Sequence, residues 1–276
     1  RNIPFNPPSM PKETDKVAWV LTRVNSSIMR KQNIKIEICA NSLQSALNAQ
    51  KAGADRVELC DNLFEGGTTP SAASIQLARK YLTSTELFVL IRPRGGHFCY
   101  NEIEMEVMLA DIEFAKQTGV DGVVLGILQS DGRIDIERTR QLVEAAKPLE
   151  TTFHRAFDVC ANPFEALEQI IDLGIDRILT SGQEQTAILG ANFIQQLVKQ
   201  ATNRIVIMPG AGINAQNIVA LQQITQAKEF HLSAKALTKS RMIFQNEKVN
   251  FGGKVAIPER DYFESSLAKI KELRNI

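Results

Sequence analysis

One arrangement repeats along this chain from residue 34 onward: a short apolar segment, a polar loop and then a segment with the periodicity of an amphipathic helix. Eight such units follow one another in roughly 240 residues. Alternating strands and helices favour a parallel sheet covered by helices, and eight units close a barrel. We therefore predict an α/β fold, a single-domain TIM (β/α)8 barrel over residues 34–276. A doubly wound open sheet is the weaker alternative, because the first unit lacks a GxGxxG loop.

The limits of these units follow from glycine, proline and capping residues. Residues 1–33 contain Pro4, Pro7, Pro8 and Pro11, so we expect them to form a flexible N-terminal extension outside the barrel. The predicted strands cover 36–39, 57–60, 88–92, 123–127, 152–155, 177–180, 205–208 and 230–233. The predicted helices cover 43–51, 72–82, 102–118, 135–146, 163–174, 187–199, 215–221 and 262–273.

Side chains alternate between the two faces of each predicted strand. The apolar set is expected to face the surrounding helices. It comprises Ile36, Ile38, Val57, Leu59, Val89, Ile91, Phe153, Ile178, Phe230 and Leu232. The other set must point into the barrel or its mouth. It comprises Glu37, Cys39, Arg56, Glu58, Cys60, Leu90, Arg92, Thr152, His154, Leu179, Ser181, His231 and Ser233.

This interior is unusual, because TIM barrels commonly fill it with Val, Ile and Leu. Buried charges are costly unless they are paired, so the ionisable groups here must satisfy one another. For Glu37 and Arg56 a salt-bridge lattice that closes the lower barrel is as good an interpretation as a functional role. Glu58, Arg92 and His154 stand near the carboxyl ends of strands, where active sites of this fold lie, and are the catalytic candidates.

The loops after several strands are rich in arginine and glycine, which suits a carboxylate or phosphate ligand. Guanidinium groups clamp anions, and glycine-rich turns expose backbone N–H groups. A glycine pair alone more often marks turn geometry, but polar or glycine-containing loops that meet on one rim are a stronger signal. The predicted anion-binding residues are Arg92, Arg94, Arg155, Ser181, Gly182, Gly210 and Gly212.

Cys39 and Cys60 end neighbouring strands on the same inward face. Neighbouring strands lie about 4.8 Å apart, so the two thiols are expected to approach one another. Two thiols without a third fixed ligand suit Cu(I) better than tetrahedral zinc, and they are the predicted metal ligands. Packing of two small hydrophobic side chains is the alternative interpretation.

Composition narrows the class of partner. The 32 Lys and Arg residues balance 31 Asp and Glu residues, which leaves a net charge of +1. This balance argues against a nucleic-acid or membrane-surface binder and favours a small ligand. Four cysteines without CxxC pairs are typical of a reducing compartment, and no apolar run is long enough to span a bilayer. We therefore expect a cytoplasmic protein.

Seven segments together resemble a known family: EICANS, AGADRVELCDNLFEGGTTPS, VLIRPRGGHFCY, TFHRAFD, RILTSG, RIVIMPGAGI and EFHLSAK. They occur in the same order in the CutC family of copper homeostasis proteins. The resemblance implies a cytoplasmic TIM barrel that forms homodimers or higher homo-oligomers and is associated with Cu(I). It places the two strand-end cysteines of that family on Cys39 and Cys60.

Two functions with defined site residues remain open from the sequence, beside a third in which the protein is a scaffold that acts through its oligomer surface. The first is copper homeostasis through Cu(I) held by Cys39 and Cys60, with no organic cofactor. The second is an enzyme, either a hydrolase, a lyase or an isomerase, that acts on a small phosphorylated or carboxylated metabolite at the barrel mouth. In that case Arg92 and Arg94 would clamp the anion, while Glu58 and His154 would act as acid and base.

Overall fold

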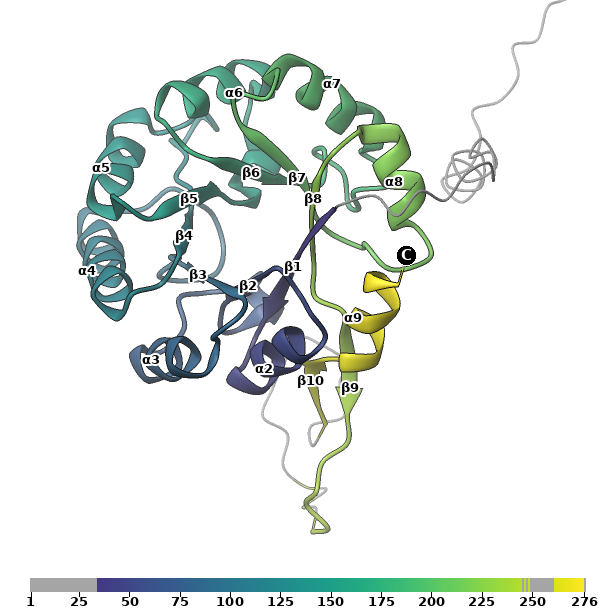
Figure 1. Cartoon of the computed structure of the whole chain (residues 1–276). Coiled ribbons are helices and arrows are strands. Elements are labelled where there is room, and N and C mark those ends of the chain that lie inside the picture. Colours follow the sequence, from purple (N-terminus) through teal and green to yellow (C-terminus); the bar gives the residue numbers. More distant parts are fainter. Residues whose placement is uncertain (1–33, 245, 247, 249–260, 276) are drawn as a thin grey trace, which may run out of the picture.

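The computed structural model describes residues 34–244, 246, 248 and 261–275. Eight parallel strands form a nearly closed barrel surrounded by helices, which is the TIM-barrel fold expected from the sequence (Figure 1). The strand order is β7-β6-β5-β4-β3-β2-β1-β8, and β8 lies beside β7 to complete the ring. The predicted N-terminal extension, residues 1–33, lies outside the described residues.

The bounds of the elements lie within two residues of the predicted ones, except that α7 begins four residues later than predicted, α8 lies three to four residues further along the chain, and α9 begins later. The barrel strands are β1 (Lys35–Ala40), β2 (Arg56–Leu59), β3 (Glu86–Leu90), β4 (Gly122–Leu125), β5 (Glu150–Phe153), β6 (Arg177–Thr180), β7 (Val206–Pro209) and β8 (Glu229–Leu232). The helices are α2 (Leu43–Lys51), α3 (Ala72–Tyr81), α4 (Glu102–Thr118), α5 (Ile136–Ala146), α6 (Pro163–Asp172), α7 (Ala191–Ala201), α8 (Ile218–Thr225) and α9 (Leu267–Arg274). Short 3-10 turns follow β2 (η1, Leu63–Glu65) and β5 (η2, Arg155–Val159).

The prediction of one helix over 262–273 is wrong at its start. Tyr262–Ser265 form strand β10, which pairs antiparallel with β9 (Lys235–Thr238) in a ribbon at the edge of the barrel (Figure 1). Helix α9 begins only after Ser266, whose side chain accepts a hydrogen bond from the Lys269 N–H group. Pairing with β9, a contact distant in sequence, therefore overrides the local helical pattern.

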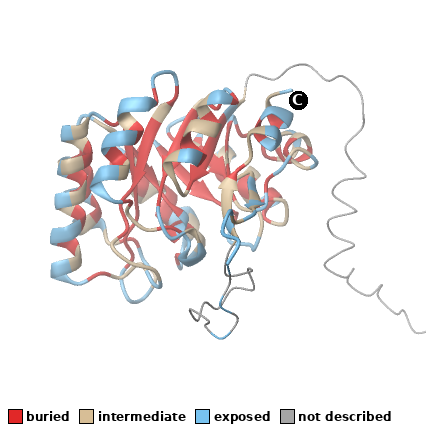
Figure 2. Ribbon diagram, turned by 90° about the horizontal axis from the view of Figure 1, so that it is seen from below, coloured by how far each residue is buried: buried red, intermediate tan, exposed pale blue. Residues whose placement is uncertain are grey.

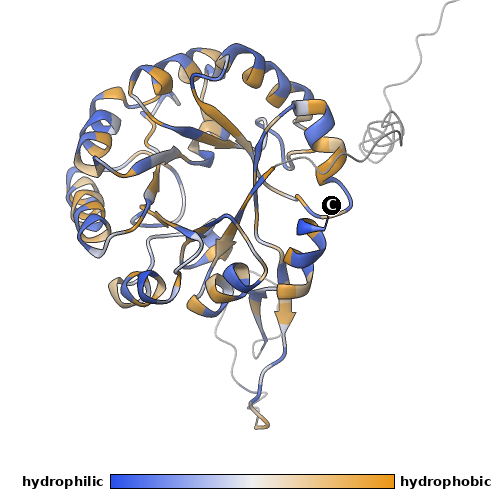
Figure 3. Ribbon diagram, in the orientation of Figure 1, coloured by the Kyte–Doolittle hydropathy of each residue, from blue (hydrophilic) through white to orange (hydrophobic). Residues whose placement is uncertain are grey.

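The alternation of side chains divides the buried residues into two clusters. All ten apolar residues predicted to face the helices belong to the large cluster between strands and helices. The small cluster comprises Cys39, Cys60, Phe88, Leu90 and Val124. Figure 2 shows the buried strands inside a shell of helices with exposed outer faces, and the helices in Figure 3 carry both hydrophilic and hydrophobic segments.

Charged groups fill the N-terminal end of the barrel interior, as the lattice interpretation of Glu37 and Arg56 anticipated. Arg56 Nη1 lies 3.2 Å from Glu37 Oε2 and 2.8 Å from Glu229 Oε2. Arg177 Nε lies 3.3 Å from the same Glu229 oxygen. The two guanidinium carbons lie 4.6 Å (Arg56) and 5.1 Å (Arg177) from the centre of the Phe88 ring. We call Arg56, Arg177, Glu37, Glu229 and Phe88 the basal plug.

The Phe88 ring needs the space left by a glycine on the next strand. A Cβ atom at Gly122 would lie 2.4 Å from the ring carbons. We predict that Gly122→Ala lowers the free energy of unfolding by about 1 to 3 kcal/mol, because the added methyl group overpacks a closed interior. Urea denaturation of Gly122→Ala, Phe88→Leu and the double variant measures the coupling. If the loss of stability in the double variant equals the sum of the losses in the two single variants, the contact between Gly122 and Phe88 is contradicted.

Candidate functional site

The two predicted metal ligands meet inside the barrel. Cys39 Sγ on β1 lies 3.6 Å from Cys60 Sγ, directly after β2. Both residues are buried and both thiols are free. Cys39 is directly opposite Glu58 in the parallel β1–β2 pair, so Cys60 stands two residues further along the same face. The period of two thus brings the thiols together at the carboxyl ends of the strands.

Glu58 joins the thiols in this layer, as its predicted place on the same face requires. One potential ligand atom each from Cys39, Glu58 and Cys60 lies within 4.8 Å of the others. Its carboxylate also faces His231 on β8, with 3.6 Å between Glu58 Oε2 and His231 Nδ1. Glu37 Oε1 lies 2.6 Å from the same nitrogen. We call Cys39, Cys60, Glu58 and His231 the thiol–carboxylate cluster.

The ionisation of this cluster is strongly perturbed. Burial raises the pKa of Glu58 to about 7, although the charge of His231 opposes the shift. Burial opposes the charging of His231, but Glu58 and Glu37 raise its pKa well above the usual range. Hydrogen bonding to Cys60 and burial raise the pKa of the Cys39 thiol. The cluster therefore combines a protonated thiol with a carboxyl group that titrates near neutrality.

Arg92 is buried, but its guanidinium group is already bound by the chain. Nη1 donates to the carbonyl oxygens of Glu65 (2.7 Å) and Gly67 (2.6 Å), and Nη2 donates to that of Gly96 (2.9 Å). The first two carbonyls belong to the loop after β2, which folds over Cys60: a Cβ atom at Gly67 would lie 3.5 Å from Cys60 Cβ. Arg92 thus holds the loop that covers the thiols.

Among the described residues, the contacts of His154 are with residues outside the thiol–carboxylate cluster. Its Nδ1 accepts a hydrogen bond from the Ala156 N–H group, and its ring lies 4.9 Å from the Phe98 ring. Burial and the charge of Arg92 lower its pKa to about 3, so the ring is neutral at physiological pH. Its buried Nε2 has no hydrogen-bond partner in the described part of the chain. The structure does not place it beside Glu58 as an acid–base pair.

The remaining predicted anion-binding groups lie at the rim and bond mainly to the protein. Arg94 Nε donates to Glu104 Oε1 at 2.5 Å. The Gly182 N–H donates to Thr180 Oγ1 and the Gly210 N–H to the Thr180 carbonyl, both at 2.9 Å. Gly212 accepts through its carbonyl oxygen from the Asn217 side chain at 2.8 Å. These loops are cross-linked by their own donors and acceptors.

The Asp158 carboxylate occupies the position where an anion would meet Arg155 and Ser181. Arg155 Nε donates to Oδ2 at 2.7 Å, and Thr180 Oγ1 donates to Oδ1 at 2.5 Å. The Ser181 N–H lies 2.9 Å from Oδ1, and the Gln183 N–H lies 3.4 Å from it. The donors that the sequence suggested for a ligand thus converge on the chain's own aspartate.

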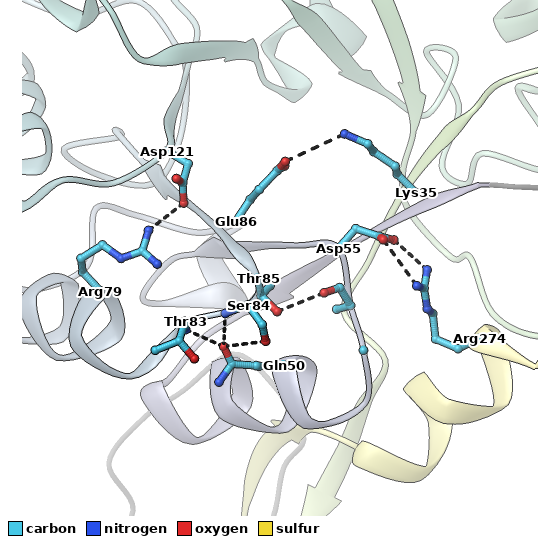
Figure 4. A pocket seen from close by; sticks show the side chains of 12 residues that line it. Lys35, Gln50, Asp55, Arg79, Thr83, Ser84, Thr85, Glu86, Asp121 and Arg274 are labelled. Atoms are coloured by element: carbon cyan, nitrogen blue, oxygen red, sulfur yellow. Dashed lines mark hydrogen bonds and ion pairs between the residues drawn. The ribbon is translucent and has the colours of Figure 1, made fainter.

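A polar hollow of about 530 Å³ lies beside the starts of β1, β2 and β3 (Figure 4). Its charged side chains are paired: Asp55 binds Arg274 at 2.7 Å and Asp121 binds Arg79 at 2.7 Å. Gln50 Oε1 accepts the Thr83 N–H at 2.7 Å. Because active sites of this fold lie at the other face, these contacts serve to tie the strand starts to the helices.

The comparisons with known proteins agree with this architecture. A sequence model of the CutC family matches residues 34–236. The chain belongs to the CutC family. A CutC family protein of Bacteroides fragilis is 50% identical over 241 residues, which are 87% of this chain and 96% of the relative. The Homo sapiens protein named copper homeostasis protein cutC homolog is 44% identical over 241 residues, 87% of this chain and 88% of the relative.

Solved structures support the same fold. The crystal structure of CutC from Streptococcus agalactiae matches with a TM-score of 0.70 and 41% identity, over 72% of this chain and 98% of that one. Phosphoribosyl anthranilate isomerase from Thermotoga maritima matches with a TM-score of 0.52 at 15% identity, over 87% of this chain and 96% of that one, which shows the barrel fold alone.

No helix among the described residues of this CutC protein is long and apolar enough to cross a membrane.

Sequence reasoning missed two contributors to the barrel interior, although a signal existed for both. Arg177 and Glu229 complete the basal plug. Each stands two residues before a residue assigned to the interior, Leu179 and His231, so the same alternation could have identified them. Asp158 lies in the short 3-10 turn η2, where the period of a strand does not predict the direction of a side chain.

The raised pKa of Glu58 predicts a pH-dependent stability. Between about pH 4.5 and pH 7 the folded state holds a proton that the unfolded state has released, so the free energy of unfolding falls as pH rises. Replacing Glu58 with the neutral, isosteric glutamine removes this loss. We expect Glu58→Gln to gain about 1 to 3 kcal/mol relative to the parent protein between pH 4.5 and pH 8. Urea denaturation across this range measures it, and parallel pH profiles would refute it.

The contacts of Asp158 predict a large loss on truncation. We expect Asp158→Ala to lower the free energy of unfolding by about 2 to 4 kcal/mol, because several buried donors lose a charged acceptor. Asp131→Ala is the matched control, since Asp131 is exposed and, among the described residues, pairs with Arg133 in a contact that water screens. Inorganic phosphate should raise the melting temperature of Asp158→Ala more than that of the parent protein. If Asp158→Ala and Asp131→Ala lose the same free energy of unfolding, the contacts of Asp158 do not stabilise the fold as predicted.

Proposed function

We propose that this CutC protein binds Cu(I) through Cys39 and Cys60 and acts in copper homeostasis. The observation that carries the proposal is the 3.6 Å separation of the two buried sulfur atoms. Soft thiolate ligands favour Cu(I), and a low coordination number needs only two of them. The names of the human and streptococcal CutC proteins, which refer to copper, add support.

The donor geometry fits a metal ion after a small adjustment. Metal–sulfur bonds are about 2.3 Å long, so two sulfurs on one ion lie no more than about 4.6 Å apart. The observed separation is shorter than this limit, and both cysteines sit on adjacent strands that hold their Cα atoms in place. Rotation of the side chains about Cα–Cβ is the change that binding requires.

The residues around the two thiols form an apolar environment that suits a metal site shielded from water. Leu90, Phe88 and Val124 pack with the cysteines in the interior cluster, and Gly67 lies against Cys60 from above. An apolar shell limits access of oxidants and water to a bound ion. The ligands must lose their protons when a metal binds, so binding releases the proton of the Cys39 thiol, whose pKa is raised by its hydrogen bond to Cys60 and by burial.

The proposal includes a cytoplasmic location, because the cytoplasm keeps thiols reduced. Assembly into a homodimer or a higher homo-oligomer stays a prediction. The exposed apolar side chains of Leu237, Tyr262, Met242, Ile243 and Phe244 in and beside the β9–β10 ribbon are of the kind that pack at such interfaces.

Replacing both sulfur ligands tests the copper proposal. We expect Cys39→Ser/Cys60→Ser to lower Cu(I) affinity by at least about a hundredfold, because hydroxyl groups are poor ligands for a soft ion. Titration against a chromogenic Cu(I) competitor under anaerobic, reducing conditions measures the affinity and the stoichiometry. Cys99→Ser is the control, since Cys99 lies outside the barrel interior in the loop after β3. Unchanged affinity in the double variant would overturn the proposal.

Catalysis on a small anionic metabolite is the second candidate. The observation in its favour is the pKa of Glu58, about 7, which lies in the range of an effective general acid or base. The bonds of Arg92 to backbone carbonyls argue against its use as an anion clamp. Turnover of phosphorylated or carboxylated metabolites that disappears in Glu58→Gln would support this function, and a broad screen without turnover would count against it.

A further inference from the structure

The Glu58 carboxylate has an unused oxygen atom inside the barrel. Glu58 is 4% exposed, and its Oε2 has no hydrogen-bond partner among the described residues. A buried, unpaired carboxylate oxygen costs free energy unless something binds it. His231 Nδ1 is 3.6 Å from this oxygen and lies closer, at 2.6 Å, to Glu37 Oε1. This oxygen is therefore available to a ligand that also contacts the thiols.

The position of this carboxylate changes the donor set of the pocket. Potential ligand atoms of Cys39, Glu58 and Cys60 all lie within 4.8 Å of one another. Two sulfurs and one carboxylate oxygen form a mixed set, whereas Cu(I) needs only soft donors. Zinc binds cysteine sulfur and carboxylate oxygen alike, and sites with three protein ligands leave a fourth tetrahedral position open.

Charge also favours a divalent ion. Two thiolates and one carboxylate carry three negative charges, of which a monovalent ion compensates one and a divalent ion two. Arg56, a buried cation of the basal plug, is already bound to Glu37 and Glu229. His231 supplies one further positive charge on the Glu58 side. A divalent ion therefore leaves the smaller uncompensated charge in a water-poor interior.

We propose that Cys39, Cys60 and Glu58 form a binding site for a divalent d10 cation, zinc(II), with an open fourth position for water or a small anion. The site shares its two sulfurs with the proposed Cu(I) site, but it depends on Glu58. His231 is a positioning residue, which Glu37 holds in place and which faces the Glu58 carboxylate. The same pocket then distinguishes the two ions by the use of Glu58.

The experiment compares zinc and copper on the same proteins. The full chain is titrated anaerobically with zinc(II) against a chromogenic chelator, and separately with Cu(I) against its own competitor. We expect the parent protein to bind one equivalent of zinc(II). Glu58→Gln should weaken zinc(II) binding by at least about tenfold and by more than it weakens Cu(I) binding. Glu58→Asp, which keeps the carboxylate, should recover part of the loss.

Controls separate a lost ligand from a damaged fold. Thermal unfolding of each variant checks that the barrel is intact, and Cys99→Ser should bind zinc(II) as the parent does. Cobalt(II) as a spectroscopic probe should show thiolate-to-metal charge transfer in the parent protein and in Cys99→Ser, but not in Cys39→Ser/Cys60→Ser.

Two results would overturn the inference: no stoichiometric zinc(II) binding by the parent protein, or equal zinc(II) affinity in Glu58→Gln and the parent. If zinc(II) fails while Cu(I) binds through the cysteines, the copper proposal stands alone. If zinc(II) binding depends on Glu58 and Cu(I) binding is absent, the zinc site stands and the copper proposal fails.

Discussion

The interior of this barrel depends on the ion pair between Arg56 and Glu37. Buried charges are tolerated only when they are paired, and here the pair lies against the Phe88 ring and is extended by Glu229. Glu37 uses its other oxygen to hold His231, which in turn faces Glu58. The basal plug therefore does more than fill space, because it orients the groups that stand beside the thiols.

The rim shows the opposite use of charged groups. Arg92 and Arg94 bind backbone carbonyls and Glu104, while Asp158 takes the donors near Ser181. Loops that are satisfied internally form a rigid frame around the barrel mouth. The groups that we propose as ligands thus lie in the thiol–carboxylate cluster, below a rim whose polar side chains mainly bind one another.

Much of this arrangement was predictable because strands impose a period of two. The face of each strand, the approach of Cys39 to Cys60 and the pairing of Glu37 with Arg56 all follow from that period and from the order of the strands. The role of Arg92 was not predictable in the same way. Its partners are carbonyl groups in two loops, and the course of a loop depends on contacts that no local pattern encodes.

The sequence by itself determined the barrel, its eight units, the membership of the CutC family and the residues that face inward. These properties depend on local periodicity and on the order of elements, which neighbouring residues encode. Only the tertiary structure decided that His231 faces Glu58, that His154 accepts from the Ala156 N–H group, and that Asp158 binds the donors around Ser181. Distances across a barrel depend on strand stagger and side-chain packing, which emerge only when the ring closes.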